Sequence, residues 1–286
     1  MKLTENVLRN LVLEVLLEEK RIKQIEEAKM EDLSDVCFVA GSTHSLATCK
    51  LGEDKYYLKF SDSWSFSKPS DKSMQIGVEY LAYKIYELYP SNTPEGIHVV
   101  SDSSKKRIGL ATREVVGVQG RDLNFKDWVG SISGGAMVDI FLANWDVANT
   151  RNFVVDPNTM KASRVDPGGA LTFRARGDRK RPFNPRAAAD QGGELGTMLD
   201  PQGYGAGFLL SAVDAKKAAS AFLSVEWPQI EQAIRSAHDE VSKELANAGL
   251  GDQLADWDSE VSEITNKLKT RHADVKEHCE YVMNQP

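Results

Sequence analysis

The sequence predicts an α+β fold of two lobes, a small β-rich lobe followed by a larger, mainly helical lobe. Two observations carry this prediction. Strand-like segments dominate residues 35–116 and enclose one helical segment. After Gly117 the pattern becomes mainly helical. We expect an N-terminal helix in residues 1–30, the first lobe in residues 31–116 and the second lobe in residues 117–286.

The first lobe is predicted as strand, strand, helix, strand, strand, after an amphipathic helix over residues 3–28. The segments VCFVAGSTHSLATCKL and KYYLKF indicate two strands joined by the turn GEDK. MQIGVEYLAYKIYELY indicates a helix ended by Pro90. GIHVVSD and RIGLATREVV indicate two further strands.

The second lobe begins with a buried helix, SGGAMVDIFLANW, followed by a β-hairpin, NFVVDPNTMKASRVD, whose turn is DPNT. A loop rich in Arg, Pro and Gly follows it. Three long helical segments then close the chain: GFLLSAVDAKKAASAFLSV, WPQIEQAIRSAHDEVSKELANAG and DSEVSEITNKLKTRHADVKEHCEYVM.

The composition narrows the functional class. The net charge is -7, so the chain lacks an overall basic surface for nucleic acid. The three cysteines, Cys37, Cys49 and Cys279, fit neither a disulfide framework nor a metal cluster, which favours a reducing compartment. We expect no signal peptide and no transmembrane segment. A cytoplasmic location follows, and the composition leaves open secretion into a host cell as an effector.

The stretch NWDVANTRNFVVDPNTMKASRVDPGGA carries the strongest chemical pattern. It places Asp146 before a loop, Asn152 at the entry to a strand and Asp166 after the next strand, at one end of a hairpin. Phosphoryl transfer needs a carboxylate near the attacking hydroxyl and oxygen ligands for Mg²⁺. Each residue alone is also typical of an ordinary turn. Together, in this order, they favour phosphoryl transfer.

This segment resembles the catalytic core of atypical kinases, the phosphoinositide kinase, actin-fragmin kinase and HipA-type groups. The resemblance implies Asp146 as the catalytic residue and Asn152 and Asp166 as ligands of Mg²⁺, with ATP as the cosubstrate. The chain departs from the family pattern in three ways. One extra residue separates Asp146 from Asn152, which makes Asn149 a rival ligand. No histidine lies beside Asp146, and DPG replaces DFG.

The first lobe contains the other parts that this family requires. Lys59 in YYLKF and Glu79 in GVEYLAYKI follow the order and spacing of the lysine that holds the nucleotide phosphates and the glutamate that orients it. A buried lysine is costly unless it is paired, so these two residues suit each other. Gly41 and Ser42 in AGSTHS are placed to cover phosphates, although such a segment is commonly a plain turn.

The loop after Asp166 reverses the acidic balance of the chain. We expect Arg174, Arg176 and Arg179 in this loop to bind an anionic acceptor: a phosphoinositide headgroup, an inositol phosphate or an acidic protein. A solvated loop with no ligand is the plain alternative.

The sequence therefore predicts an ATP- and Mg²⁺-dependent kinase. Three alternatives stay open: a non-catalytic kinase-like module that only binds nucleotide, a kinase-fold enzyme that transfers AMP, and a helical scaffold in which the acidic motifs are turns.

Overall fold

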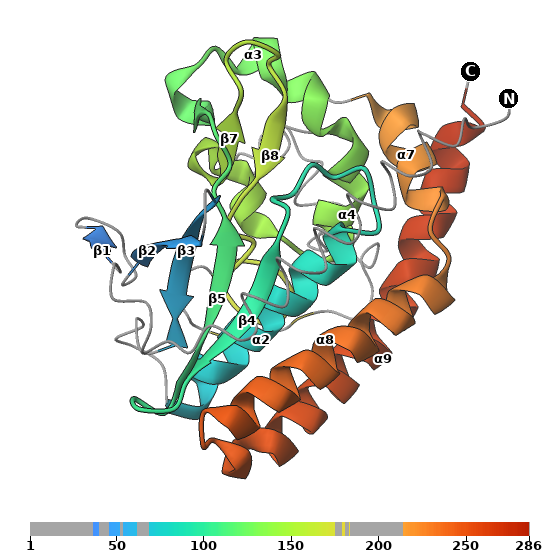
Figure 1. Cartoon of the computed structure of the whole chain (residues 1–286). Helices are drawn as coiled ribbons and strands as arrows, with labels where there is room; N and C mark the ends of the chain where they lie inside the picture. The colour runs from blue at the N-terminus through green and yellow to red at the C-terminus, as the bar shows by residue number, and fades with distance from the viewer. Residues whose placement is uncertain are drawn as a thin grey trace, which may run out of the picture.

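The computed structural model describes residues 37–39, 46–51, 54–61, 69–174, 179–180, 183 and 214–285. Over these residues the fold is mixed α/β, with two antiparallel sheets and several helices, three of them at the C-terminal end (Figure 1). The helix predicted for residues 3–28, the segment containing Gly41 and Ser42, and Arg176 all lie outside the described residues. Those predictions stay untested.

The larger sheet contains five antiparallel strands in the order β1-β2-β3-β5-β4. In β3, Tyr56, Leu58 and Phe60 are buried at the two-residue spacing that places side chains on one side of a strand. Lys59 points to the other side and is buried there as well. The strands are β1 (Cys37–Val39), β2 (Leu46–Leu51), β3 (Asp54–Phe60), β4 (Ile97–Asp102) and β5 (Arg107–Arg113).

Helix α2 (Pro69–Tyr86) connects β3 to β4 and packs against β4 and β5. Proline suits the first turn of a helix because the amide it lacks would have no helical acceptor there. The helix ends four residues before Pro90, earlier than the sequence pattern predicts. Its last turn loosens, with the amide of Leu88 donating to the carbonyl of Ile85 rather than to that of Lys84.

The smaller sheet contains three antiparallel strands in the order β6-β7-β8. The predicted hairpin is present, and its turn is fixed by Asp156, which accepts hydrogen bonds from the amide of Asn158 and the hydroxyl of Thr159. The added strand β6 was not predicted. The strands are β6 (Val118–Gln119), β7 (Phe153–Val155) and β8 (Ala162–Arg164).

Short helical segments connect β6 to β7 within the smaller sheet. The continuous helix predicted for SGGAMVDIFLANW is wrong in extent: its first residues belong to a 3-10 segment, Val129–Gly135, and only Ala136–Phe141 forms the α-helix α4. The others are 3-10 Gly120–Asp122, α3 (Phe125–Trp128), 3-10 Trp145–Ala148 and 3-10 Thr150–Asn152.

Three helices close the chain: α7 (Ala215–Leu223), α8 (Trp227–Asn247) and α9 (Leu254–Met283), with a 3-10 turn at Gly251–Gln253 between the last two. Helix α8 packs against both α2 and β4, and α9 packs against α7 and α8 (Figure 1). One hydrophobic cluster runs from α2 through α4 to α9, so residues before and after 117 share a core. None of the helices described is apolar over a length that could cross a bilayer.

Candidate active site

One face of α2 organises the candidate site. Glu79, Tyr83 and Tyr86 follow one another at spacings of four and three residues, which places them on the same side of a helix. Glu79 contacts Lys59, Tyr83 contacts the backbone of Asp166, and Tyr86 contacts Asp139. A single rigid element therefore contacts β3, the end of the hairpin and α4.

Lys59 lies between two carboxylates. Its Nζ is 2.7 Å from Oε2 of Glu79 and 2.8 Å from Oδ1 of Asp166. Burial disfavours the ammonium, but the charges of Asp166 and Glu79 outweigh it and raise the pKa of Lys59. Burial also raises the pKa of Glu79 to about 7, against the opposing charge of Lys59. The lysine is therefore a fixed positive charge at the edge of the site.

Asp166 has a left-handed backbone conformation, with φ of 58°. Aspartate tolerates this region better than most residues because its short polar side chain bonds locally. The Asp166 amide donates to the hydroxyl of Tyr83 at 2.9 Å. This hydrogen bond ties the backbone of Asp166 to α2. The Asp166 side chain remains 48% exposed, so its carboxylate is held at the surface of the site rather than inside the core.

Asn152 connects the loop of Asp146 to the strand before Asp166. Its carbonyl accepts from the amide of Val165 at 2.9 Å, and its side-chain Nδ2 donates to the carbonyl of Asp146 at 3.1 Å. The rival residue, Asn149, is exposed and uses its Oδ1 to accept from the amide of Arg151. The structure thus places Asn152 next to the Asp146 and Asp166 segments and gives Asn149 a turn-capping contact.

The Asp146 carboxylate lies within electrostatic reach of the same charges. Its pKa is raised, first by burial and then by the negative charge of Asp166, while Lys180 and Lys59 act in the opposite direction. The hairpin, β3 and the segment after Asp166 therefore bring Asp146, Asp166 and Lys59 into one electrostatic group.

Two glycines make this close packing feasible. A Cβ on Gly168 would lie 3.1 Å from Oε2 of Glu79, 3.2 Å from Oδ1 of Asp166 and 3.3 Å from Nζ of Lys59. A Cβ on Gly169 would lie 2.5 Å from Cγ of Asp146, closer than atoms of this kind approach. The Asp146 carboxylate therefore packs directly on the backbone of Gly169.

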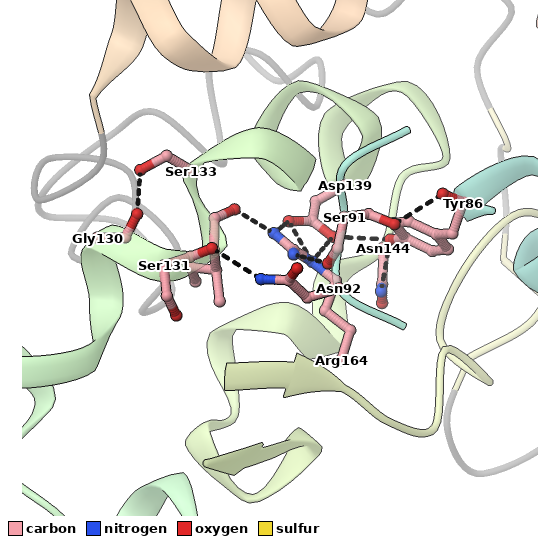
Figure 2. A network of polar contacts seen from close by, with 10 residues as sticks. Tyr86, Ser91, Asn92, Gly130, Ser131, Ser133, Asp139, Asn144 and Arg164 are labelled. Carbon is pink, nitrogen blue, oxygen red and sulfur yellow. Dashed lines mark hydrogen bonds and ion pairs between the residues drawn. The ribbon is translucent and has the colours of Figure 1, made fainter. Parts of the chain in front are cut away.

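A buried polar network holds the residues that precede the Asp146 and Asp166 loops (Figure 2). The guanidinium of Arg164, at the end of β8, forms hydrogen bonds with both carboxylate oxygens of Asp139 on α4, at 2.8–3.2 Å. Tyr86 donates to Asp139 at 2.7 Å and accepts from Nδ2 of Asn144 at 3.0 Å. Arg164 lies two residues before Asp166 and Asn144 two residues before Asp146, so this network fixes the start of each loop.

The predicted acceptor arginines have different surroundings. Arg179 forms ion pairs with Asp71 on α2, at 3.1 Å, and with Glu260 on α9, at 2.7 Å. It therefore joins the segment after Asp166 to two helices, a structural contact that the sequence did not suggest. Arg174 is exposed, and its carbonyl accepts from Gln75 at 3.4 Å.

Several residues of this site were not found from the sequence: Tyr83, Arg164, Lys180 and the glycine pair. Tyr83 and the glycines had local signals, because Tyr83 follows Glu79 by four residues and the glycines follow Asp166 directly. Over the residues that the structure describes, no group of three or more His, Cys, Asp or Glu is arranged to hold a metal ion. The predicted metal ligands are only two residues, Asp166 and Asn152, and do not form such a group.

No protein-family model and no curated protein sequence matches the chain. Among solved structures, the chain is similar to the crystal structure of a Helicobacter pylori proinflammatory kinase, CtkA. The alignment covers 87% of this chain and 96% of that chain, with 14% sequence identity and a TM-score of 0.42. A similarity of this size is weak and bears on neither cofactor nor substrate.

Proposed function

We propose that this protein is an ATP- and Mg²⁺-dependent phosphotransferase with a two-lobed, kinase-like architecture, which transfers the γ-phosphoryl group to a hydroxyl. One observation carries the proposal. A buried lysine, Lys59, is shared by a helix glutamate and by Asp166, and a further carboxylate, Asp146, is brought beside them. This arrangement combines the fixed cation, the metal-ligand oxygens and the base that phosphoryl transfer requires.

The donor set suits magnesium and a triphosphate. Mg²⁺ prefers oxygen ligands, and Asp166 with the side-chain oxygen of Asn152 supplies them, since the nitrogen of that amide already donates to Asp146. The local charge also suits a divalent cation, because it would offset the negative charge of Asp166 that contributes to the raised pKa of Asp146. When bound, the metal would neutralise charge on the phosphates.

The residues of the chain then have separate tasks. Lys59, held in position by Glu79, binds the nucleotide phosphates through its ammonium group. Asp146 orients the acceptor hydroxyl and accepts its proton at the carboxylate. Burial raises the pKa of Asp146, which makes it a stronger base than an exposed aspartate while the nearby lysines favour its ionised form.

The acceptor is proposed as an anionic molecule: a phosphoinositide, an inositol phosphate or a protein. Of the three arginines predicted to bind it, Arg174 is exposed, Arg179 is engaged with Asp71 and Glu260, and Arg176 lies outside the described residues. Arg174 is therefore the best remaining candidate among the described residues.

The test is incubation with Mg²⁺ and γ-labelled ATP against lipids, inositol phosphates and proteins. Asp146→Asn and Asp166→Ala should each lower turnover by roughly a thousandfold, about 4 kcal/mol of transition-state stabilisation. Asp156→Asn is the matched control, because Asp156 lies in the same hairpin but fixes its exposed far turn. Wild-type turnover by a folded Asp166→Ala protein would refute the site.

Parallel incubation with α-labelled ATP and thermal unfolding with nucleotide separate the alternatives. Transfer of label from α-labelled ATP, with none from γ-labelled ATP, would identify an AMP-transferring enzyme. Thermal stabilisation by nucleotide without transfer to any acceptor would identify a binding module. Absence of nucleotide binding would leave only the scaffold.

A further inference from the structure

Lys180 is a buried lysine that the proposed reaction does not use directly. Its side chain passes between two backbone segments, and its Nζ donates hydrogen bonds to the carbonyls of Ala143 and Gly169. Ala143 lies three residues before Asp146, and Gly169 lies three residues after Asp166. One ammonium group therefore joins the two segments that carry the proposed base and the proposed metal ligand.

Burying the ammonium group of Lys180 costs free energy unless the surrounding groups compensate its charge. A buried ammonium loses its hydration, and carbonyl oxygens replace only part of it. Lys180 is 6% exposed. The Asp146 carboxylate lies near enough for Lys180 to oppose the rise in its pKa, so the buried positive charge has a negative counterpart at the centre of the site.

Each of the two backbone segments that Lys180 joins contains a strained residue. Ala143 and Leu171 have φ values of 51° and 56°, in a region that non-glycine residues rarely occupy. Such residues persist only where the surrounding structure holds them. Here the amide of Leu171 donates to the carbonyl of Leu142 at 2.7 Å, beside the Lys180 contacts. Three hydrogen bonds thus hold together two strained segments.

Lys180 is itself held in place. Its amide donates to the carbonyl of Thr172 at 2.8 Å, and the hydroxyl of Thr172 donates to Oε1 of Glu260 at 2.6 Å. The neighbouring Arg179 binds the other oxygen of Glu260, at 2.7 Å. Thr172 and Arg179 are therefore both anchored to Glu260 on α9, and the backbone of Lys180 is held against Thr172.

We propose that Lys180 is a positioning residue that fastens the Asp146 loop to the segment Pro167–Gly169 and so sets where the Asp146 carboxylate stands relative to Asp166. This inference rests on the proposed function for its effect on turnover, but the fastening itself is independent of it. Lys180 acts through Asp146 and Gly169 and is not assigned a contact with substrate.

The test compares Lys180→Met, Lys180→Arg and Lys243→Met, all in the full chain. Methionine keeps the apolar length of lysine without the charge, arginine keeps charge and donors, and Lys243 is an exposed lysine on α8 that serves as the control. Hydrogen exchange measured by mass spectrometry follows peptides spanning residues 142–149 and 166–172, with α8 as reference. Steady-state kinetics give kcat and the KM for ATP.

In Lys180→Met we expect exchange at both loops to rise at least tenfold while α8 and α9 stay protected. Turnover should fall about a hundredfold, with the KM for ATP within about threefold of wild type, as for a misplacement of about 1 Å. Lys180→Arg should restore most of the protection and turnover, and Lys243→Met should match wild type.

Three results would overturn the inference: unchanged exchange at both loops in Lys180→Met, exchange that rises equally in α8 and α9, or no recovery by arginine. If the wild-type protein transfers no phosphate from ATP, the proposed function fails. The exchange comparison still decides whether Lys180 fastens the two loops.

Discussion

Replacing Gly169 with alanine tests the geometry of the site with one added methyl group. The Cβ of that alanine would stand 2.5 Å from Cγ of Asp146. The Asp146 side chain or the loop backbone must move, because Asp146 is the residue that the added methyl group meets. Alanine removes no charge and no hydrogen bond of the site, so any loss of turnover reports on position alone.

The size of the effect follows from the distance. Ordinary van der Waals contact begins at 3.4 Å, so the Asp146 carboxylate has to retreat by about 1 Å. A displacement of this size at a reacting group lowers rates by about a hundredfold. Gly168→Ala should have a smaller effect, because its Cβ would meet Glu79, Asp166 and Lys59 at 3.1–3.3 Å and needs shifts of only a few tenths of an ångström.

The assay is transfer from γ-labelled ATP to the best acceptor of the panel, with the unfolding free energy measured alongside in urea. Gly130→Ala is the control, since a Cβ there meets no atom within 4 Å. The expected order of turnover is Gly130→Ala, equal to wild type, then Gly168→Ala, then Gly169→Ala. Turnover of a folded Gly169→Ala protein within threefold of wild type would show that the Asp146 position does not matter for the reaction.

Three further predictions concern stability. Arg164→Met should lower the free energy of unfolding by roughly 3–5 kcal/mol, because Asp139 would keep its hydrogen bond from Tyr86 but lose its charged partner in the buried interior. Urea unfolding measures this. Arg235→Met, at an exposed ion pair, should change the free energy of unfolding by less than about 1 kcal/mol. Gly77→Ala should destabilise the protein, because the added Cβ would lie 2.8 Å from the Trp257 ring and overpacking costs about 1–3 kcal/mol. This cost exceeds the helix preference of alanine over glycine, about 1 kcal/mol. An unchanged or higher unfolding midpoint in urea would contradict the prediction. Burial lowers the pKa of His238, but its hydrogen bonds to Asp239 and Asp258 outweigh burial and raise it. The contribution of His238 to stability is therefore full below pH 6.5 and is lost as pH rises through the raised pKa. The difference in unfolding free energy between wild type and His238→Gln should shrink over that interval, and a difference that stays constant or grows would count against the contact.

The sequence was informative where chemistry and local pattern coincide. Strand alternation predicted β3 and therefore a strand position for Lys59, and helical periodicity predicted the helix of Glu79. The 2.7 Å ion pair between Lys59 and Glu79 agrees with the expectation that a buried lysine and a buried glutamate belong together. These features depend on residue types within short windows, which a single sequence displays.

Contacts between distant segments were not predictable in the same way. Arg179 was interpreted as an acceptor-binding residue because it belongs to a basic run, yet its partners, Asp71 and Glu260, are 108 and 81 residues away in sequence. Lys180 belongs to the same basic stretch of sequence, and only the fold brings its ammonium group to the carbonyls of Ala143 and Gly169. A charged loop residue has the same local pattern whether it faces solvent or closes an ion pair.

The glycine pair that follows Pro167 bears on whether the proposed site has room for its charged groups. In this chain, position 168 faces Lys59, Glu79 and Asp166, and position 169 faces Asp146. Any side chain at position 169 would push the Asp146 carboxylate away, and one at position 168 would crowd the lysine and its two partners. This close packing of charged groups requires glycine at position 169, and glycine at position 168 relieves a milder crowding. The two glycines therefore fit the proposed enzyme, and label transfer by the wild-type protein separates the enzyme from the non-catalytic module.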